Sequence, residues 1–94
     1  MTIFELGDMF DMDLVITKYA NQKDRWVASF SGLEIKEDKE SSILASSYGD
    51  SNSPYHAIEQ YRNSIQGKYG VLNATSKEMR REFHIPKSLV MSYE

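Results

Sequence analysis

Apolar and polar residues alternate along two neighbouring stretches in the first third of the chain. Residues 13–19 (DLVITKY) are rich in β-branched side chains, and residues 25–30 (RWVASF) carry apolar side chains at every second position. A polar segment, residues 21–24, separates them. Alternation with a period of two on both sides of a short polar segment is typical of a β-hairpin. The pattern therefore predicts two antiparallel strands, with a bulge or a bend at Ser31-Gly32 after which residues 33–35 prolong the second strand.

A charged turn and a third strand are expected next. Residues 36–40 carry five consecutive charges, which cannot be buried without partners and therefore indicate a solvated turn. Residues 41–48 (SSILASSY) are expected to return as the third strand. Such short connections between strands predict a three-stranded antiparallel meander.

The clearest pattern in the chain is helical and covers residues 54–66. Ser53 is suited to the N-cap, Pro54 to the first helical position, and Gly67 to the left-handed residue that often follows a helix. The helix is expected to lay one apolar side on residues 26–30 of the sheet. That side consists of Ala57, Ile58, Tyr61 and Ile65.

The segment after the helix is expected to be extended. Residues 69–74 are short and apolar, and residues 79–85 alternate before Pro86 ends the pattern. Phe83 and Ile85 should face inward, which predicts a fourth strand at about residues 79–85.

The two ends of the chain are expected to be less regular. Thr2 and Glu5 match a capping box, which marks a helix start, whereas Gly7 weakens any helix of more than about a turn. Residues 1–12 are therefore expected to form an irregular lid over the core. Residues 87–94 form a tail that either docks on the core or frays.

Together these elements predict one α+β domain that spans residues 1–94. The chain is too short to divide into two stable cores. Its expected architecture is a three-stranded antiparallel meander packed against one helix at about residues 54–66, with an additional strand at about 79–85.

Composition and charge indicate which partners and which cellular compartment to expect. The chain has 11 Lys and Arg against 14 Asp and Glu, a net charge of −3, whereas proteins that bind mainly to phosphates are usually basic. The absence of Cys excludes disulfides, thiolate metal sites and a Cys nucleophile. The amino terminus lacks the pattern of a signal peptide, and no apolar stretch approaches the ~18 residues of a membrane span. We therefore expect a soluble cytoplasmic protein, with no membrane contact and with nucleic acid disfavoured as a partner.

Residues 48–58 (YGDSNSPYHAI) carry a resemblance to a known family. A strand that runs into a Gly-containing turn and then a helix opening S-P-x-x-A-I resembles the core of HicB-type antitoxins, and residues 80–86 (RREFHIP) resemble the strand after that helix. The resemblance covers about residues 13–86 and implies a β-β-β-α fold related in shape to double-stranded RNA-binding domains. The whole chain also looks like small phage and prophage proteins of unknown function.

Two departures limit what the resemblance implies. Double-stranded RNA-binding domains place lysines at the start of this helix, where this chain has Ser53-Pro54-Tyr55-His56. HicB antitoxins usually carry a further DNA-binding segment, for which the residues after Pro86 are too few. The resemblance therefore implies a fold, and a fold alone does not establish a function.

No motif for catalysis or metal binding emerges from the sequence. Asp8, Asp11 and Asp13 lack the turn glycine and the terminal Glu of the calcium loop. His56 and His84 lack the spacing of a zinc site, and no serine lies in a G-x-S-x-G elbow. We therefore expect neither enzymatic activity nor a cofactor nor a metal site.

Six residues are candidates for contacting a partner. Four of them form a basic group, for which a solvated edge strand is the alternative interpretation. The other two are tyrosines at the ends of the predicted helix, of the type enriched at protein interfaces. The candidates are Lys77, Arg80, Arg81, His84, Tyr55 and Tyr69.

The leading hypothesis is a non-enzymatic protein-binding module of phage or prophage type, HicB-like, that inhibits or regulates a host or phage protein. The alternative is a weak nucleic-acid-binding protein that uses residues 77–84. Both a monomer and a homodimer formed by pairing of strand edges remain open.

Overall fold

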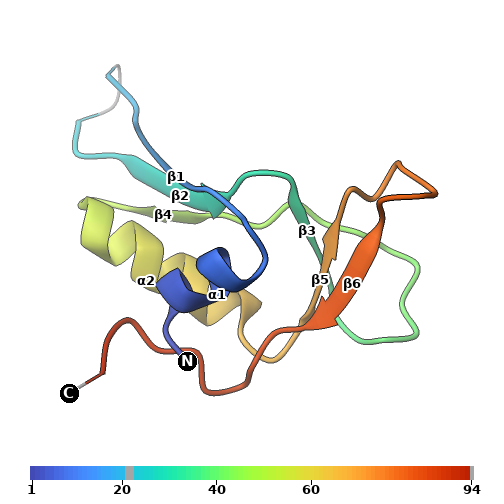
Figure 1. Cartoon of the computed structure of the whole chain (residues 1–94). Coiled ribbons are helices and arrows are strands. Elements are labelled where there is room, and N and C mark those ends of the chain that lie inside the picture. The colour runs from blue at the N-terminus through green and yellow to red at the C-terminus, as the bar shows by residue number, and fades with distance from the viewer. Residues whose placement is uncertain (21–22, 94) are drawn as a thin grey trace.

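The computed structural model describes residues 1–20 and 23–93, which form an α+β structure with two antiparallel sheets (Figure 1). In chain order, the elements are α1 (Ile3–Met9), β1 (Leu14–Lys18), β2 (Trp26–Phe30), β3 (Leu33–Lys36), β4 (Gly49–Ser51), α2 (Pro54–Ile65), β5 (Tyr69–Leu72) and β6 (Arg81–His84).

Each sheet has three strands. Sheet 1 has the order β1-β2-β4, and sheet 2 has the order β3-β5-β6. The chain passes from sheet 1 to sheet 2 at Ser31-Gly32. Gly32 has a φ of +77°, which residues with a Cβ rarely adopt. The bend predicted there is confirmed, but β3 pairs with β5 and does not prolong β2.

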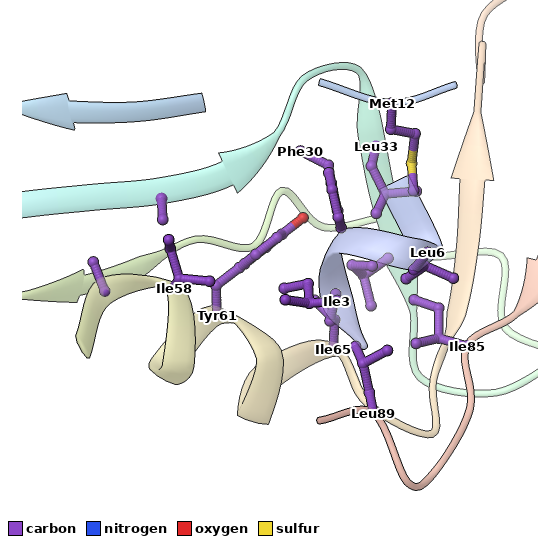
Figure 2. Close-up of a cluster of buried hydrophobic side chains, with 13 residues drawn as sticks. Ile3, Leu6, Met12, Phe30, Leu33, Ile58, Tyr61, Ile65, Ile85 and Leu89 are labelled. Atoms are coloured by element: carbon purple, nitrogen blue, oxygen red, sulfur yellow. The ribbon is translucent and has the colours of Figure 1, made fainter. Parts of the chain in front are cut away.

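Helix α2 packs on sheet 1 through the predicted apolar side. Ile58, Tyr61 and Ile65 are buried, and the ring of Tyr61 meets the ring of Phe30 edge to face at 5.7 Å (Figure 2). Ser53 caps the helix by accepting a hydrogen bond from the His56 N–H. The predicted helix and its packing on β2 are therefore confirmed.

Strand β4 lies against the backbone of α2. A Cβ placed on Gly49 would overlap the carbonyl oxygen of Ala57 and lie 2.6 Å from the Tyr61 nitrogen. Only glycine allows this approach, and it sets the distance between sheet 1 and α2.

Helix α1 covers the core where the two sheets meet. Its capping box is formed, with Thr2 and Glu5 bonded to each other's backbone N–H, and it buries Ile3 and Leu6 (Figure 2). At Gly7 the helix packs closely on the Phe30 ring, since a Cβ added there would lie 3.0 Å from that ring. Residues 3–9 thus form a regular helix and not the irregular turn expected from Gly7, since tight packing offsets the intrinsic cost of glycine.

The tail docks. Leu89 is fully buried, and Val90 exchanges backbone hydrogen bonds with Met1 and Ile3 at 3.0 and 2.9 Å. Tyr93 bonds to Glu5, which lowers the pKa of the Glu5 carboxyl and raises that of Tyr93. Of the two alternatives left open by the sequence, docking applies to residues 87–93, while residue 94 lies outside the described part.

The predicted third strand is wrong in position. Residues 41–48 contribute only an isolated bridge between Ala45 and Ile35, and the third strand of sheet 1 is Gly49–Ser51. The predicted fourth strand exists as β6 but belongs to sheet 2. Residues 21–22 of the predicted hairpin turn lie outside the described residues.

Candidate functional site

Strand β1 is an exposed edge of sheet 1. It pairs with β2 on one side, and no strand of the described residues adjoins its other side (Figure 1). Val15 and Ile16 keep 45% and 40% of their surface exposed, and Tyr19, directly after the strand, keeps 45%. An uncovered strand edge with apolar side chains is a ready template for another strand.

The backbone groups of β1 alternate between β2 and solvent. The pair Asp13–Ser31 before the strand and the pair Tyr19–Arg25 after it each carry a backbone hydrogen bond, of 2.9 and 3.0 Å. Because hydrogen-bonded pairs alternate along an antiparallel ladder, the odd-numbered residues of β1 bond to β2. The N–H and C=O groups of the even-numbered residues therefore point outward. These residues are Leu14, Ile16 and Lys18.

The other three sheet edges in the described part of the chain are protected. Strand β4 has only three residues. The outer edge of β3 is covered by Ala45, which exchanges hydrogen bonds of 2.9 and 3.0 Å with Ile35. Strand β6 carries Arg81 and Glu82, and charges on an edge discourage pairing. Among the strands of residues 1–20 and 23–93, only β1 combines length, apolar side chains and free backbone groups.

Helix α2 does not cover β1, although one face of β1 lies on the same side of the sheet as the helix. Leu14, Ile16 and Lys18 lie opposite Phe30, Ala28 and Trp26 of β2, whose buried members pack on α2. Ile16 nevertheless stays 40% exposed, since α2 lies under β2 and β4. The Lys18 ammonium lies 5.5 Å from the centre of the Trp26 ring.

Arg25, directly before β2, holds sheet 1 together. Arg25 donates from Nε and Nη2 to Asp50 Oδ2 of β4, both at 2.9 Å, and this hydrogen bond raises the pKa of Arg25. The same guanidinium lies 5.1 Å from the centre of the Tyr19 ring at the end of β1. Arg25 thereby ties β2 to both of its neighbouring strands, β4 and β1, which fixes the edge of β1.

The predicted contact residues do not form one surface. Tyr69 and His84 are brought together on sheet 2, where they are cross-strand partners with ring centres 4.9 Å apart. Tyr55 lies on α2, 55% exposed, and its ring meets that of His56. The two tyrosines thus belong to separate parts of the surface.

The basic residues are also divided. Arg81 lies over the ring of Phe10, which is stacked on Phe83 with ring centres 3.8 Å apart. Arg80 donates to the Ala74 carbonyl at 3.3 Å and lies 3.8 Å from Glu82, while Lys77 is exposed on the preceding loop. Nucleic-acid binding through residues 77–84 stays a prediction, and these positions offer it a scattered set of charges.

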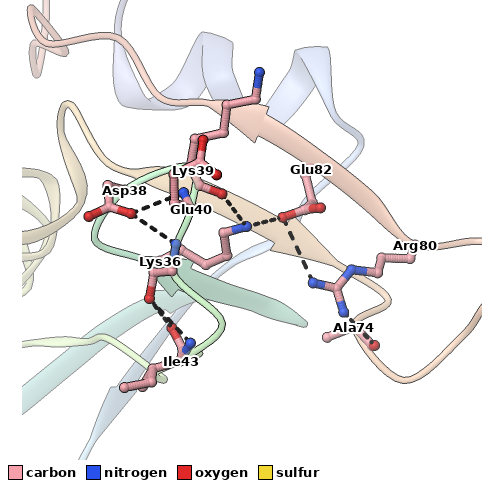
Figure 3. Close-up of polar contacts among 9 residues, drawn as sticks. Lys36, Asp38, Lys39, Glu40, Ile43, Ala74, Arg80 and Glu82 are labelled. Atoms are coloured by element: carbon pink, nitrogen blue, oxygen red, sulfur yellow. Dashed lines mark hydrogen bonds and ion pairs between the residues drawn. The ribbon is translucent and has the colours of Figure 1, made fainter.

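One lysine of sheet 2 is nearly buried. The side chain of Lys36 is 8% exposed, and its Nζ donates to Glu82 Oε1 at 2.5 Å and to the Lys39 carbonyl at 3.1 Å (Figure 3). Because β3 and β6 are the outer strands, this pair crosses β5 on the side where Val71 is fully buried. The hydrogen bond from Lys36 lowers the pKa of the Glu82 carboxyl. This pair therefore acts as a structural cover for sheet 2.

A groove of about 550 Å³ lies beside β6. Its lining includes the apolar residues Phe10, Met12, Leu72 and Met79 and the charged residues Asp11 and Arg81. It holds no pairing of a nucleophile with a base of the kind that catalysis needs.

Metal ligands are not gathered in the described residues. No group of three or more His, Asp or Glu side chains there is arranged to hold an ion. Asp8, Asp11 and Asp13 surround the turn between α1 and β1, where Asp11 has a φ of 54° typical of turn-forming Asp.

Comparison of the chain with protein-family models, with curated proteins and with solved structures found no match. The resemblance to HicB-type antitoxins and to phage proteins therefore stays a prediction. Among residues 1–20 and 23–93, no helix has the length and apolar character needed to cross a bilayer.

Proposed function

We propose that this chain is a non-enzymatic, cytoplasmic protein-binding module that takes up an extended protein segment along the edge of β1. The observation that carries the proposal is the uncovered, apolar edge of β1, with three residues whose backbone groups point to solvent. Strand addition uses these groups for affinity and the flanking side chains for specificity.

The other edges of the two sheets support this choice. Each is shortened, covered or charged, so that β1 is where a further strand can pair at least cost. A HicB-like inhibitor or regulator of phage or prophage origin would use this edge to hold a segment of a host or phage protein.

The test is a comparison of two baits. Proline at residue 16 removes an N–H that points to solvent and leaves the backbone hydrogen bonds between β1 and β2 intact. Ile16→Pro should therefore fold but should not pair with an added strand. We expect the wild-type chain to retain a stoichiometric protein partner from a host lysate and Ile16→Pro to lose it. Equal retention by both baits, or recovery of nucleic acid alone, would refute the proposal.

A further inference from the structure

We infer that, when no partner segment is bound, the β1 edge is occupied by β1 of a second copy of this chain. The inference rests on the proposed function, since it names the partner of the same edge. In the resulting homodimer, the two copies would share a six-stranded antiparallel sheet with the order β4-β2-β1-β1-β2-β4.

The backbone of β1 fits a copy of itself. A two-fold axis perpendicular to the sheet pairs even-numbered with even-numbered residues, which are those whose N–H and C=O groups point outward. With the axis at Ile16, Leu14 faces the partner's Lys18 and Lys18 faces the partner's Leu14. This register supplies about six hydrogen bonds and leaves no outward group of β1 unpaired.

Neighbouring registers satisfy fewer groups. An axis at Val15 would need the Met12 N–H to bond to the partner, but that N–H already donates to the Gly7 carbonyl at 2.8 Å. An axis at Thr17 would pair Leu14 with the partner's Ala20, which lies beyond the strand in the turn. The axis at Ile16 is therefore the register that the structure favours.

Side chains and charges agree with this register. The two Ile16 side chains would meet on the side facing α2, and Val15 would lie opposite the partner's Thr17 on the other side, forming β-branched cross-strand pairs. The strand is preceded by Asp13 and ends with Lys18. Antiparallel pairing places the basic end of each strand at the acidic end of the other, whereas parallel pairing would place like charges together.

The overhang of β1 beyond α2 gives the second copy room. Because α2 lies under β2 and β4, it does not stand in the path of the partner's β1. The two α2 helices would lie on the same side of the shared sheet, and the exposed apolar surface of Leu14 and Ile16 would be covered between them.

The absence of Cys allows a direct test by single-cysteine cross-linking of the otherwise native chain. Residues directly opposite each other in a hydrogen-bonded pair have Cα atoms about 5.5 Å apart, which a disulfide can bridge. We expect Ile16→Cys to form a covalent dimer under mild oxidation. Thr17→Cys is the matched control, since its Cα atoms would lie more than about 7 Å apart, and we expect it to remain uncrosslinked.

Light scattering gives the second measurement. The wild-type chain is expected to show twice the mass of one chain, and Ile16→Pro, with unchanged circular dichroism, the mass of one. A single-chain mass up to about 1 mM wild-type chain, where even a millimolar Kd would show, would overturn the inference. So would Thr17→Cys cross-linking as well as Ile16→Cys.

The outcome also separates this inference from the proposed function. If the wild-type chain is monomeric but captures a protein that Ile16→Pro does not, the second copy is refuted and strand addition stands. If the chain is monomeric and the two baits behave alike, both proposals fail.

Discussion

The close approach of β4 to α2 makes Gly49 the glycine whose replacement should be most costly. In Gly49→Ala, the new Cβ would overlap the Ala57 carbonyl oxygen and lie 2.6 Å from the Tyr61 nitrogen. Both are backbone atoms of a helix, so they cannot turn aside as a side chain would. Relief requires β4 and α2 to move apart, which opens the core around Tyr61.

The size of the effect follows from this geometry. Overpacking a core costs about 1–3 kcal/mol when side chains can adjust. Because only backbone can move here, we expect Gly49→Ala to lower the free energy of unfolding by about 3 kcal/mol or more. That is a large part of the ~5–14 kcal/mol expected for a domain of this length.

Gly32→Ala is the matched control. No atom lies within 4 Å of the position of its Cβ, but its φ of +77° is left-handed, which costs a residue with a Cβ about 1–2 kcal/mol. We therefore expect a loss of only about 1 kcal/mol, since alanine also restricts the unfolded chain.

Both variants can be measured by urea unfolding, with the fluorescence of Trp26, the single tryptophan, as the probe. A loss below about 1 kcal/mol for Gly49→Ala, or a larger loss for Gly32→Ala than for Gly49→Ala, would refute the close packing of β4 on α2.

Three further predictions concern stability. Burial raises the pKa of Tyr61 to about 12, so the folded state disfavours ionisation of this side chain. The free energy of unfolding should therefore fall, by at most about 3 kcal/mol, as the pH rises from 10 to 12. Tyr61→Phe should reduce this fall, measured as the change in the urea midpoint with pH. Lys36 lowers the pKa of Glu82, so the stability from this pair is present above the ordinary carboxyl pKa and lost as the pH falls below it; Glu82→Gln should flatten the decline in an acid titration. Val15→Pro removes an N–H bonded to β2 and should lower the urea midpoint more than Ile16→Pro does, and equal midpoints would contradict the assigned strand alternation.

Helix α2 was predictable because the residues that start it, end it and form its apolar side are close together in the sequence. A cap at Ser53, proline at the next position, an apolar stripe and Gly67 all lie within residues 53–67, and each acts over a few residues. The α+β class followed from this helix and from the period-two pattern of the hairpin.

The third strand was not predictable from local pattern. Strand β4 consists of Gly49, Asp50 and Ser51, residue types typical of turns, and it becomes a strand because it fits between β2 and the backbone of α2. Residues 41–48 look more like a strand, but the departure of β3 into sheet 2 leaves them only the bridge at Ala45. Tertiary packing overrode propensity in both segments.

The candidate site likewise depended on tertiary structure and not on local sequence pattern. The β-branched run of β1 was visible in the sequence, but its position at an edge depends on the order of strands in sheet 1. Val15 and Ile16 were therefore missed as contact residues. Tyr69 and His84 meet only because β5 and β6 pair in a particular register, which no spacing along the chain reveals.

The most direct test of the central claim is amide hydrogen exchange along β1, measured in dilute and in concentrated protein. In dilute protein, Val15 and Thr17 should be protected by β2, whereas Leu14, Ile16 and Lys18 should exchange rapidly. Concentration should slow the exchange of these three amides, because a second copy accepts their hydrogen bonds. Rapid exchange of the three at every concentration would contradict pairing of β1 with itself, and protection of them in dilute protein would contradict an open edge.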